Sequence, residues 1–393
     1  MNRENLLIIL KKIWIAAAVI GFIGLIIRFA TGEKFANYGS YITWGLWVAI
    51  YFHGIGIAGG VYLIGIVGYF LKWPVFKDSL RTTLIISFSA LVMGFFTIWI
   101  DLGHPLRIFG FLISPQFKSM MAFNAWAYGL FLVILVASFV LTYRKKSESD
   151  TNDRSGWLVP LLLTGIPFVI AIPSQSGAFF GVVNAKSFWN SAIMPVLFFL
   201  SAVASGAAVL ALAHNLLSAD EKQSNNPKSE YYTLLKKFIA AAVILYLFFE
   251  IAEFSLPLWS GTSHIAEEVK FILFGPFWWL FWLVHVGGAV AGIFFLFRSN
   301  SAQDIGIGAF LIAVTFLASR LNIIVPGQAI SDINGLREAF SDEKLALTYL
   351  PSVFEWMVAL FSGCMITGLI YFGEKYRKEY HTKLTEIFNK GGK

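Results

Sequence analysis

Cysteine and charged residues are both scarce in this chain of 393 residues. Its single cysteine, Cys364, excludes an internal disulfide, and one thiolate is too few to hold an iron–sulfur cluster. Charged residues make up only 13% of the chain, whereas hydrophobic residues make up 57%. Because a soluble globular domain of this length would not match that balance, the composition predicts a protein that crosses the membrane several times.

Histidine is rare as well, with six residues in all. A b-type haem needs two axial histidines at matching depth, and only His53 and His285 lie comparably deep in apolar runs. They fall in different halves of the chain, which argues against a b-type cytochrome membrane anchor but leaves it as an alternative. We therefore expect no haem, iron–sulfur cluster or metal site in this chain.

Basic residues outnumber acidic ones, and the net charge is +7. They concentrate in the segments between apolar runs and in the tail at residues 375–393. This is the distribution that anionic lipid and membrane topology favour. We therefore expect these basic residues to interact with the lipid bilayer and not with a nucleic acid.

Ten apolar runs reach the length of about 20 residues that a helix needs to cross a membrane. They lie near residues 13–30, 41–71, 82–101, 121–143, 157–183, 191–216, 233–258, 274–297, 303–325 and 350–372. The first run lacks a small-residue cleavage pattern and is interpreted as an uncleaved span.

The lysines and arginines predict the orientation of these spans. Assigning the connecting segments to alternating sides places 21 of the 30 basic residues on the side of both termini. The sequence thus predicts a multi-pass protein of the cytoplasmic (inner) membrane with cytoplasmic N- and C-termini. Residues 144–156 and 218–237 become cytoplasmic linkers, and residues 101–120, 183–190, 257–274 and 325–349 face outward.

A weak internal repeat suggests how the helices are grouped. The segment Ala-Gly-Gly-Val at residues 58–61 aligns with Ala-Ser-Gly-Ala at residues 204–207, and spans two to five then map onto spans six to nine. Any two helical hairpins of similar length would align in this way, so the identity alone carries little weight.

We predict an all-α polytopic membrane protein with two tandem four-helix bundles and one flanking helix at each end. The predicted domains are an N-terminal flanking helix, a first bundle, a second bundle, and a C-terminal flanking helix with a basic cytoplasmic tail. They cover residues 1–40, 41–183, 184–330 and 331–393.

Seven ionisable side chains lie inside or at the ends of apolar runs, toward the predicted outer face. A charge in hydrocarbon costs about 3 kcal/mol or more, so such residues face the bundle interior and mark chemistry or transport. The seven are His53, Asp101, Glu250, Glu253, His285, Arg320 and Glu355.

His53 shares one helical stripe with Gly56 and Gly60. These two glycines let another helix approach closely, so His53 is expected to point into a crevice between helices. The alternative is a structural hydrogen bond to a neighbouring carbonyl.

The segment Asp-Leu-Gly-His-Pro-Leu-Arg at residues 101–107 ends the third span. Asp101 can accept a hydrogen bond from a hydroxyl, and His104 can relay the proton, since imidazole gains and loses protons near neutral pH. The alternative is that Asp101 pairs with Arg107 as a staple at the membrane surface.

In the second half, Glu250 and Glu253 lie one turn apart and could form a proton route with His285 and Arg320. The alternative is an ion pair with Arg320, which we expect for one of the two glutamates, while the other lies on the proton route. Glu355 falls in the first turn of the last span, where the helix dipole alone favours an acidic residue, so we do not predict it to be catalytic.

Together these motifs resemble the NrfD/PsrC family, the membrane subunits of polysulfide reductase-like respiratory complexes. The resemblance rests on residues 44–51, 56–60, 101–107, 118–126, 188–190, 198–202, 326–328 and 349–352, and on Gly206, Arg320 and Glu355. The number of spans resembles the long, ten-helix branch of the family.

The resemblance implies a quinol or quinone site in the first bundle, near the extracytoplasmic face. Tyr51, His53, Asp101 and Arg107 are then the predicted quinone-binding residues, and Asp101, His104 and His53 the predicted catalytic ones. Tyr51 and His53 point about 200° apart on a helix, so only one can face the same ligand directly.

The family also implies partners. Quinone or menaquinone is the bound substrate, and electrons pass to or from an extrinsic ferredoxin-like iron–sulfur subunit or a multihaem cytochrome c, with release or uptake of protons. A molybdopterin or other catalytic subunit could complete the complex, and the protein alone is expected to be inactive. The direction of electron flow stays open. A secondary transporter is the remaining alternative, although neither half of the sequence shows a matched pair of broken helices.

Overall fold

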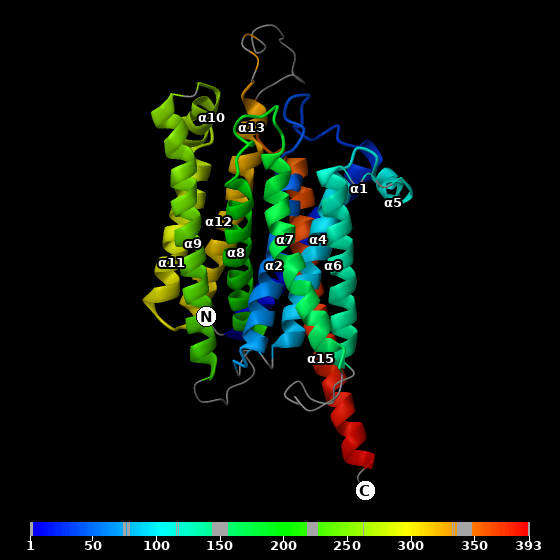
Figure 1. Ribbon diagram of the computed structural model, residues 1–393. Coiled ribbons are helices and arrows are strands. Elements are labelled where there is room, and N and C mark those ends of the chain that lie inside the picture. Colours follow the sequence, from blue (N-terminus) through cyan, green and yellow to red (C-terminus); the bar gives the residue numbers. More distant parts are fainter. Residues whose placement is uncertain are drawn as a thin grey trace.

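The computed structural model describes residues 3–391 except 74–75, 77–78, 115, 117, 144–155, 218–226, 262, 332, 334 and 336–347. Within those residues, ten helices are long and apolar enough to cross a membrane, which confirms the predicted all-α polytopic fold. They run side by side in one bundle (Figure 1). The long helices are α1 (Arg3–Thr31), α2 (Leu46–Phe70), α4 (Leu80–Asp101), α6 (Met120–Tyr143), α7 (Leu158–Gly181), α8 (Met194–Leu217), α9 (Pro227–Ser260), α12 (Ala302–Ile324), α15 (Val353–Gly391), and the continuous pair η3 (Leu280–Val286) and α11 (Gly287–Arg298).

The helices pack as two groups of four. In the first, α2 contacts α4 and α7, and α6 contacts the same two helices; in the second, α8 contacts α9 and α12, and α11 contacts the same two. The flanking helices α1 and α15 pack against each other, and α15 also contacts α4. This arrangement matches the predicted plan of helices, while the domain boundaries themselves stay predictions.

Helix α2 is the most buried span because it contacts both groups. Besides α4 and α7, it packs against α8 and α12 of the second group. Its sequence is apolar all round, which suits a helix surrounded by protein. The hydrophobic core is therefore continuous between the two groups.

The contact between α2 and α8 supports the internal repeat. Positions 52, 56 and 60 of α2 lie against positions 198, 202 and 206 of α8, the same offset that aligns residue 58 with residue 204. The rings of Phe52 and Phe198 are 5.8 Å apart, and a Cβ atom on Gly60 would meet the backbone of Ala202 and Gly206. Equivalent residues that touch each other are expected only near a two-fold axis, so the two groups are related by a parallel repeat.

Short helices cover one end of the bundle, called the outer end below because the sequence predicts it to be extracytoplasmic. These are η1 (Pro105–Phe109), α5 (Gly110–Ile113), α10 (Ser263–Phe274) and α13 (Pro326–Ala329). Helix α10 lies within the segment 257–274, which was predicted only as an outward connection, and α9 extends into the same segment. Its twelve residues are too few to span a membrane, so the span criterion missed it.

One further prediction needs correction. Residues 218–237 were expected to form a linker, but α9 begins at Pro227, and only residues 218–226 lie outside the described part of the chain. The basic residues of the tail belong to α15, which continues to Gly391 as one helix of 39 residues. The linker at residues 144–156 falls almost entirely outside the described residues.

The start of α2 is fixed by residues from the last third of the sequence. The side-chain oxygen of Gln328 accepts hydrogen bonds from the backbone N–H groups of Thr43 (3.0 Å) and Trp44 (3.1 Å), and its amide donates to the Trp44 carbonyl (2.9 Å). The Tyr349 hydroxyl accepts from the N–H of Leu46 at 2.8 Å. These bonds satisfy a helix start that has no side-chain cap of its own.

Candidate functional site

A pocket of about 130 Å³ opens at the outer end of the first group of helices. Helix α2 and the turn before it provide one wall, the end of α4 a second, and α6 and α7 the rest. The lining residues are Trp44, Val48, Tyr51, Phe52, Ile98, Asp101, Leu102, Met121, Asn124 and Phe179. The pocket is thus largely apolar, with three polar side chains in its wall.

Two of these polar side chains carry acceptor atoms without a partner. Asp101 Oδ1 and Asn124 Oδ1 are buried and accept no hydrogen bond from the described residues. The Asn124 amide nitrogen points elsewhere, donating to the Gln175 carbonyl at 3.5 Å. A buried acceptor without a partner costs about 1–3 kcal/mol, so the pocket is suited to a ligand with hydroxyl donors.

Arg28 of α1 holds the end of α4 on which Asp101 lies. Its guanidinium donates to the carbonyls of Ile100 (2.9 Å) and Leu102 (3.0 Å), on either side of Asp101, and pairs with Glu33 at 2.9 Å. Only 3% of Arg28 is exposed. A cation at the last carbonyls of a helix is favourable, so Arg28 both caps α4 and positions the carboxylate.

Two tyrosines pack beside this end of the pocket wall. The ring of Tyr38 stacks on that of Tyr349 at 5.8 Å. Burial raises the pKa of Tyr38 well above its ordinary value, and the nearby charges of Asp101, Tyr349 and Glu355 raise it further. Burial and Glu355 likewise raise the pKa of Tyr349. Both phenols are therefore neutral donors at physiological pH.

Glu355 is a structural residue at the start of α15. Its carboxylate accepts hydrogen bonds from the Ser352 N–H (3.1 Å), the Asn37 N–H (2.9 Å) and the Tyr349 hydroxyl, while its own N–H donates to Ser352 Oγ at 3.2 Å. The reciprocal bonds with Ser352 form a capping box. This agrees with the interpretation of Glu355 as a helix-start residue.

The predicted site residues of the first half separate in the structure. Tyr51 and Asp101 line the pocket together, whereas His53, His104 and Arg107 are not among its lining residues. His53 lies on the face of α2 that carries Gly56, close to Ala202 and Arg320 in the second group. His104 and Arg107 are exposed, and no ion pair in the described part of the chain joins Arg107 to Asp101. The surface-staple alternative for Asp101 is therefore wrong.

Sequence reasoning did not single out Asn124 or Arg28. Each is a polar residue in an apolar run, Asn124 in the fourth span and Arg28 near the end of the first. Their position beside Asp101, however, depends on contacts between segments that are distant in the sequence.

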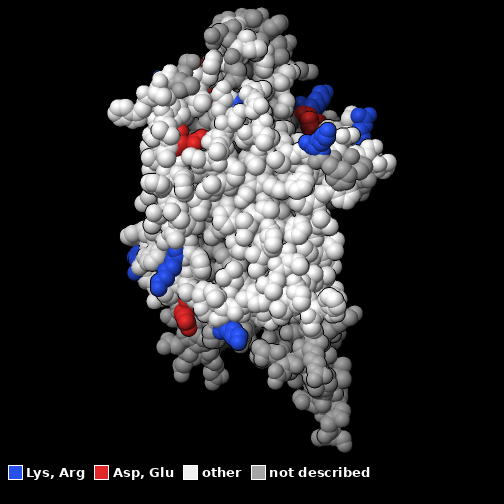
Figure 2. Space-filling model, viewed as in Figure 1, with Lys and Arg blue, Asp and Glu red and all other residues white. Residues whose placement is uncertain are grey.

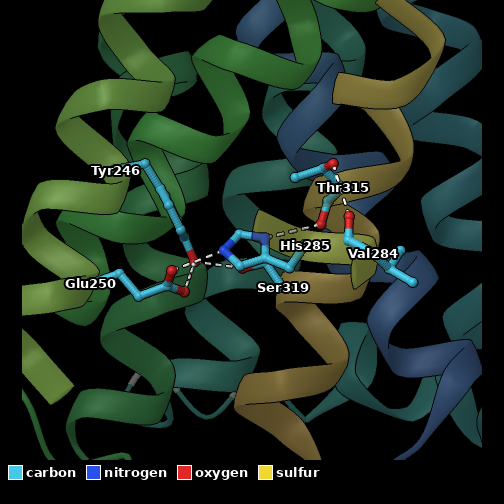
Figure 3. A network of polar contacts seen from close by, with 6 residues as sticks. All are labelled: Tyr246, Glu250, Val284, His285, Thr315 and Ser319. Atoms are coloured by element: carbon cyan, nitrogen blue, oxygen red, sulfur yellow. Dashed lines mark hydrogen bonds and ion pairs between the residues drawn. The ribbon is translucent and has the colours of Figure 1, made fainter. Parts of the chain in front are cut away.

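In the second group, Glu250 and His285 form a buried pair (Figure 3). His285 Nε2 lies 2.9 Å from Glu250 Oε2, and Nδ1 lies 3.4 Å from the Thr315 carbonyl. The hydroxyl of Tyr246 donates to Glu250 Oε1 at 3.2 Å and lies 2.5 Å from Ser319 Oγ. A π-helical turn, η3, places His285 in this network, which joins α9, η3 and α12.

Arg320 points away from both glutamates. It donates to the Phe198 carbonyl at 3.3 Å and to Ser201 Oγ, and its guanidinium lies 3.6 Å from the centre of the Phe198 ring. Neither Glu250 nor Glu253 forms an ion pair with it in the described residues, so the predicted Glu–Arg pairing is wrong. Glu253 is half-buried and outside the network of Figure 3.

Comparison with known proteins agrees with this architecture. The family model described as polysulphide reductase, NrfD, matches residues 34–332. A selenate reductase subunit of Mesobacillus selenatarsenatis is 26% identical over 384 residues, covering 88% of this chain and 89% of that protein. The Hdr-like menaquinol oxidoreductase integral membrane subunit of Archaeoglobus fulgidus is 22% identical, covering 92% of this chain and 90% of that protein. One of the polysulfide reductase chains of Wolinella succinogenes is 25% identical, covering 73% and 95%. The chain belongs to the polysulphide reductase NrfD family.

Proposed function

We propose that this chain is the quinone-interacting membrane subunit of a respiratory oxidoreductase complex, with quinol or quinone bound in the pocket between Tyr51, Asp101 and Asn124. The observation that carries the proposal is the pair of unpartnered acceptors, Asp101 Oδ1 and Asn124 Oδ1, in one apolar pocket. A quinol presents hydroxyl donors on a flat apolar ring, which complements both features. The relatives include a menaquinol oxidoreductase subunit, which favours menaquinol.

Each polar residue of the pocket has its own role in the proposed reaction. Oxidation of a quinol to a quinone releases two protons and two electrons. Asp101 accepts a hydroxyl proton as the general base, Asn124 orients the ring by accepting a hydrogen bond, and Tyr51 supplies a further hydroxyl in the wall. His104 is exposed three residues beyond Asp101, and in this proposal it takes the proton outward. The same groups return protons when the reaction runs toward quinol.

The electrons pass to or from an extrinsic subunit at the outer end, either a ferredoxin-like iron–sulfur protein or a multihaem cytochrome c. Arg107 and Lys118 are exposed there, as is Lys34. Figure 2 shows Lys and Arg side chains at the upper right, with acidic atoms between them, over the ends of α1 and α5 and above a wide uncharged band. A positive patch beside the pocket suits an acidic docking surface on that partner.

Replacing Asn124 with leucine tests the proposal. In the intact complex, Asn124→Leu is expected to weaken binding of a reduced quinol analogue about tenfold, because one hydrogen bond to the ring is lost. Asn190→Leu, at an exposed amide of the outer end, is the control and should bind normally. Equal affinity of both variants, measured by fluorescence titration, would reject the pocket as the quinol site.

A second function, proton movement through the second group, is favoured by the buried Glu250–His285 pair. A carboxylate and an imidazole in hydrogen-bond contact can exchange a proton, and Tyr246 and Ser319 extend the series of donors. In proteoliposomes, Glu250→Gln is expected to lower the number of protons moved per electron while quinol oxidation continues. Glu267→Gln, at an exposed outer carboxylate, is the control. An unchanged proton-to-electron ratio in Glu250→Gln would exclude this route.

A further inference from the structure

Behind the wall of the proposed quinol pocket, two further hydroxyl groups lie between α6 and α7. The Tyr128 hydroxyl is 2.8 Å from Ser176 Oγ, and Ser176 Oγ donates to the Ile172 carbonyl at 2.9 Å. Both side chains are only 1% exposed, and neither is among the lining residues of the pocket. Any effect of theirs on a bound ligand therefore passes through a residue of the wall.

Tyr51 of α2 is that residue. It lines the pocket and is half-buried. Its ring meets the Tyr128 ring edge-on, with centres 6.3 Å apart, and the two side chains hydrogen-bond to each other. Tyr51, Tyr128 and Ser176 therefore form one series of hydroxyls, which begins in the pocket wall and ends at a backbone carbonyl of α7.

The hydrogens of this series point away from the pocket. A serine or tyrosine hydroxyl donates one hydrogen and accepts through its oxygen. Ser176 uses its hydrogen on the Ile172 carbonyl, so Tyr128 is the donor in its bond to Ser176. Tyr128 then has only its oxygen left, which makes Tyr51 the donor in the bond between the two tyrosines. The Tyr51 oxygen therefore presents a lone pair, and not a hydrogen, to the pocket.

Reversing the series costs one hydrogen bond. To turn its hydrogen into the pocket, Tyr51 must accept from Tyr128, and Tyr128 must accept from Ser176. Ser176 then no longer donates to the Ile172 carbonyl. The carbonyls of an oxidised ring only accept, so they bind Tyr51 only after this reversal, whereas a hydroxyl of the reduced ring donates to Tyr51 without it. One hydrogen bond corresponds to about a tenfold difference in affinity.

We propose that Tyr128 and Ser176 are positioning residues that make Tyr51 a hydrogen-bond acceptor and thereby make the pocket selective for the reduced ring. The inference rests on the proposed function, because it concerns the same pocket, and it adds the redox form that the pocket prefers. All three polar side chains of the wall, Tyr51, Asp101 and Asn124, then offer acceptors to the ring. The selectivity is set by two residues that never touch the ligand.

Binding of both redox forms to the intact complex tests the inference, with a short-chain naphthoquinol and the matching naphthoquinone as probes. Anaerobic fluorescence titration gives the two dissociation constants, and the readout is the ratio of the quinone constant to the quinol constant. Tyr51→Phe removes the acceptor, so it should weaken quinol binding about tenfold and leave quinone binding unchanged. The ratio should therefore fall about tenfold.

Two variants behind the wall test the positioning itself. Tyr128→Phe frees the Tyr51 hydrogen to face the pocket, so it should tighten quinone binding and lower the ratio about tenfold. Ser176→Ala should lower the ratio as well, because Tyr128 loses the oxygen to which it donates and can donate to Tyr51 instead. A loss of packing alone would weaken both forms equally and leave the ratio unchanged.

Tyr62→Phe is the matched control. Tyr62 is a fully buried tyrosine of α2 whose hydroxyl donates to the Leu162 carbonyl at 3.0 Å, and it is not among the lining residues of the pocket. The ratio should keep its parental value in this variant. Equal weakening of both forms in Tyr128→Phe would give Tyr128 a purely structural role, and weaker quinone binding in Tyr51→Phe would make Tyr51 a donor. Either result overturns the inference.

Asn124→Leu separates this inference from the proposed function. If Asn124→Leu weakens quinol binding while Tyr51→Phe and Tyr128→Phe leave the ratio unchanged, the pocket binds quinol but the inference is wrong. If Asn124→Leu and Tyr51→Phe both leave the two dissociation constants unchanged, the proposed function fails, and the inference fails with it.

Discussion

Asp101→Asn is expected to lower quinol-dependent reduction of the partner subunit by about 10²- to 10⁴-fold, the usual contribution of a positioned general base. The amide has nearly the shape of the carboxylate and can still accept a hydrogen bond, but it does not take up a proton. Arg28 contacts the backbone on either side of residue 101, so the end of α4 keeps its position. Stopped-flow reduction of the partner by menaquinol, with the complex purified intact, measures the effect.

Glu267→Gln is the matched control, because it removes the same charge from the same end of the molecule at an exposed position of α10. Its turnover should equal that of the parent complex. If Asp101→Asn also turned over at the parental rate, the carboxylate would have no part in proton transfer. If the variant complex lost its extrinsic subunit, Asp101 would instead contribute to docking.

Much of the fold could be predicted from the sequence because membrane spans obey a simple rule. Backbone groups in hydrocarbon must bond within their own segment, so length and apolarity suffice to find each span. All ten predicted spans correspond to helices. The same rule does not detect α10, which is short and carries Glu267 and Lys270, or the π-helical turn at η3, which depends on packing around His285.

The site was only partly predictable for a different reason. Tyr51 and Asp101 belong to local motifs, and the structure brings them into one pocket. Asn124 of α6 lines the same pocket, and Arg28 of α1 contacts the end of α4 that carries Asp101. The spacing of residues along the sequence does not predict such contacts between distant segments. The roles of His53, His104 and Arg107 stay predictions, because none of them lines the pocket.

The assignment of Glu250 and His285 illustrates the same limit. Their burial inside the second group was expected from the cost of placing charge in hydrocarbon. The sequence did not predict the partner of Glu250, because both His285 and Arg320 were candidates. The structure pairs the carboxylate with the imidazole across α9 and η3, and directs Arg320 to Phe198 and Ser201 of α8.

Gly60→Ala is expected to destabilise the protein strongly, because α2 and α8 are closest at this residue. A Cβ atom on Gly60 would lie 1.8 Å from the Ala202 carbonyl oxygen and 2.6 Å from its carbon, both backbone atoms that move only with their helix. Overpacking of a tight core costs about 1–3 kcal/mol and sometimes more. Gly206→Ala should behave alike, since its Cβ would lie 2.4 Å from the Gly60 carbonyl carbon.

Gly129→Ala separates this steric effect from the general effect of replacing glycine in a helix. Gly129 lies in α6, and a Cβ there would meet nothing within 4 Å, so the change should be neutral or slightly stabilising. Thermal unfolding of the three variants in one detergent compares them directly. Separation of α2 from α8 would also displace Tyr51 and Phe52, so Gly60→Ala should weaken quinol binding as it lowers the unfolding temperature. Equal unfolding temperatures for Gly60→Ala and Gly129→Ala would contradict the close contact of the two repeats, and with it the rigid support that α8 gives to the pocket.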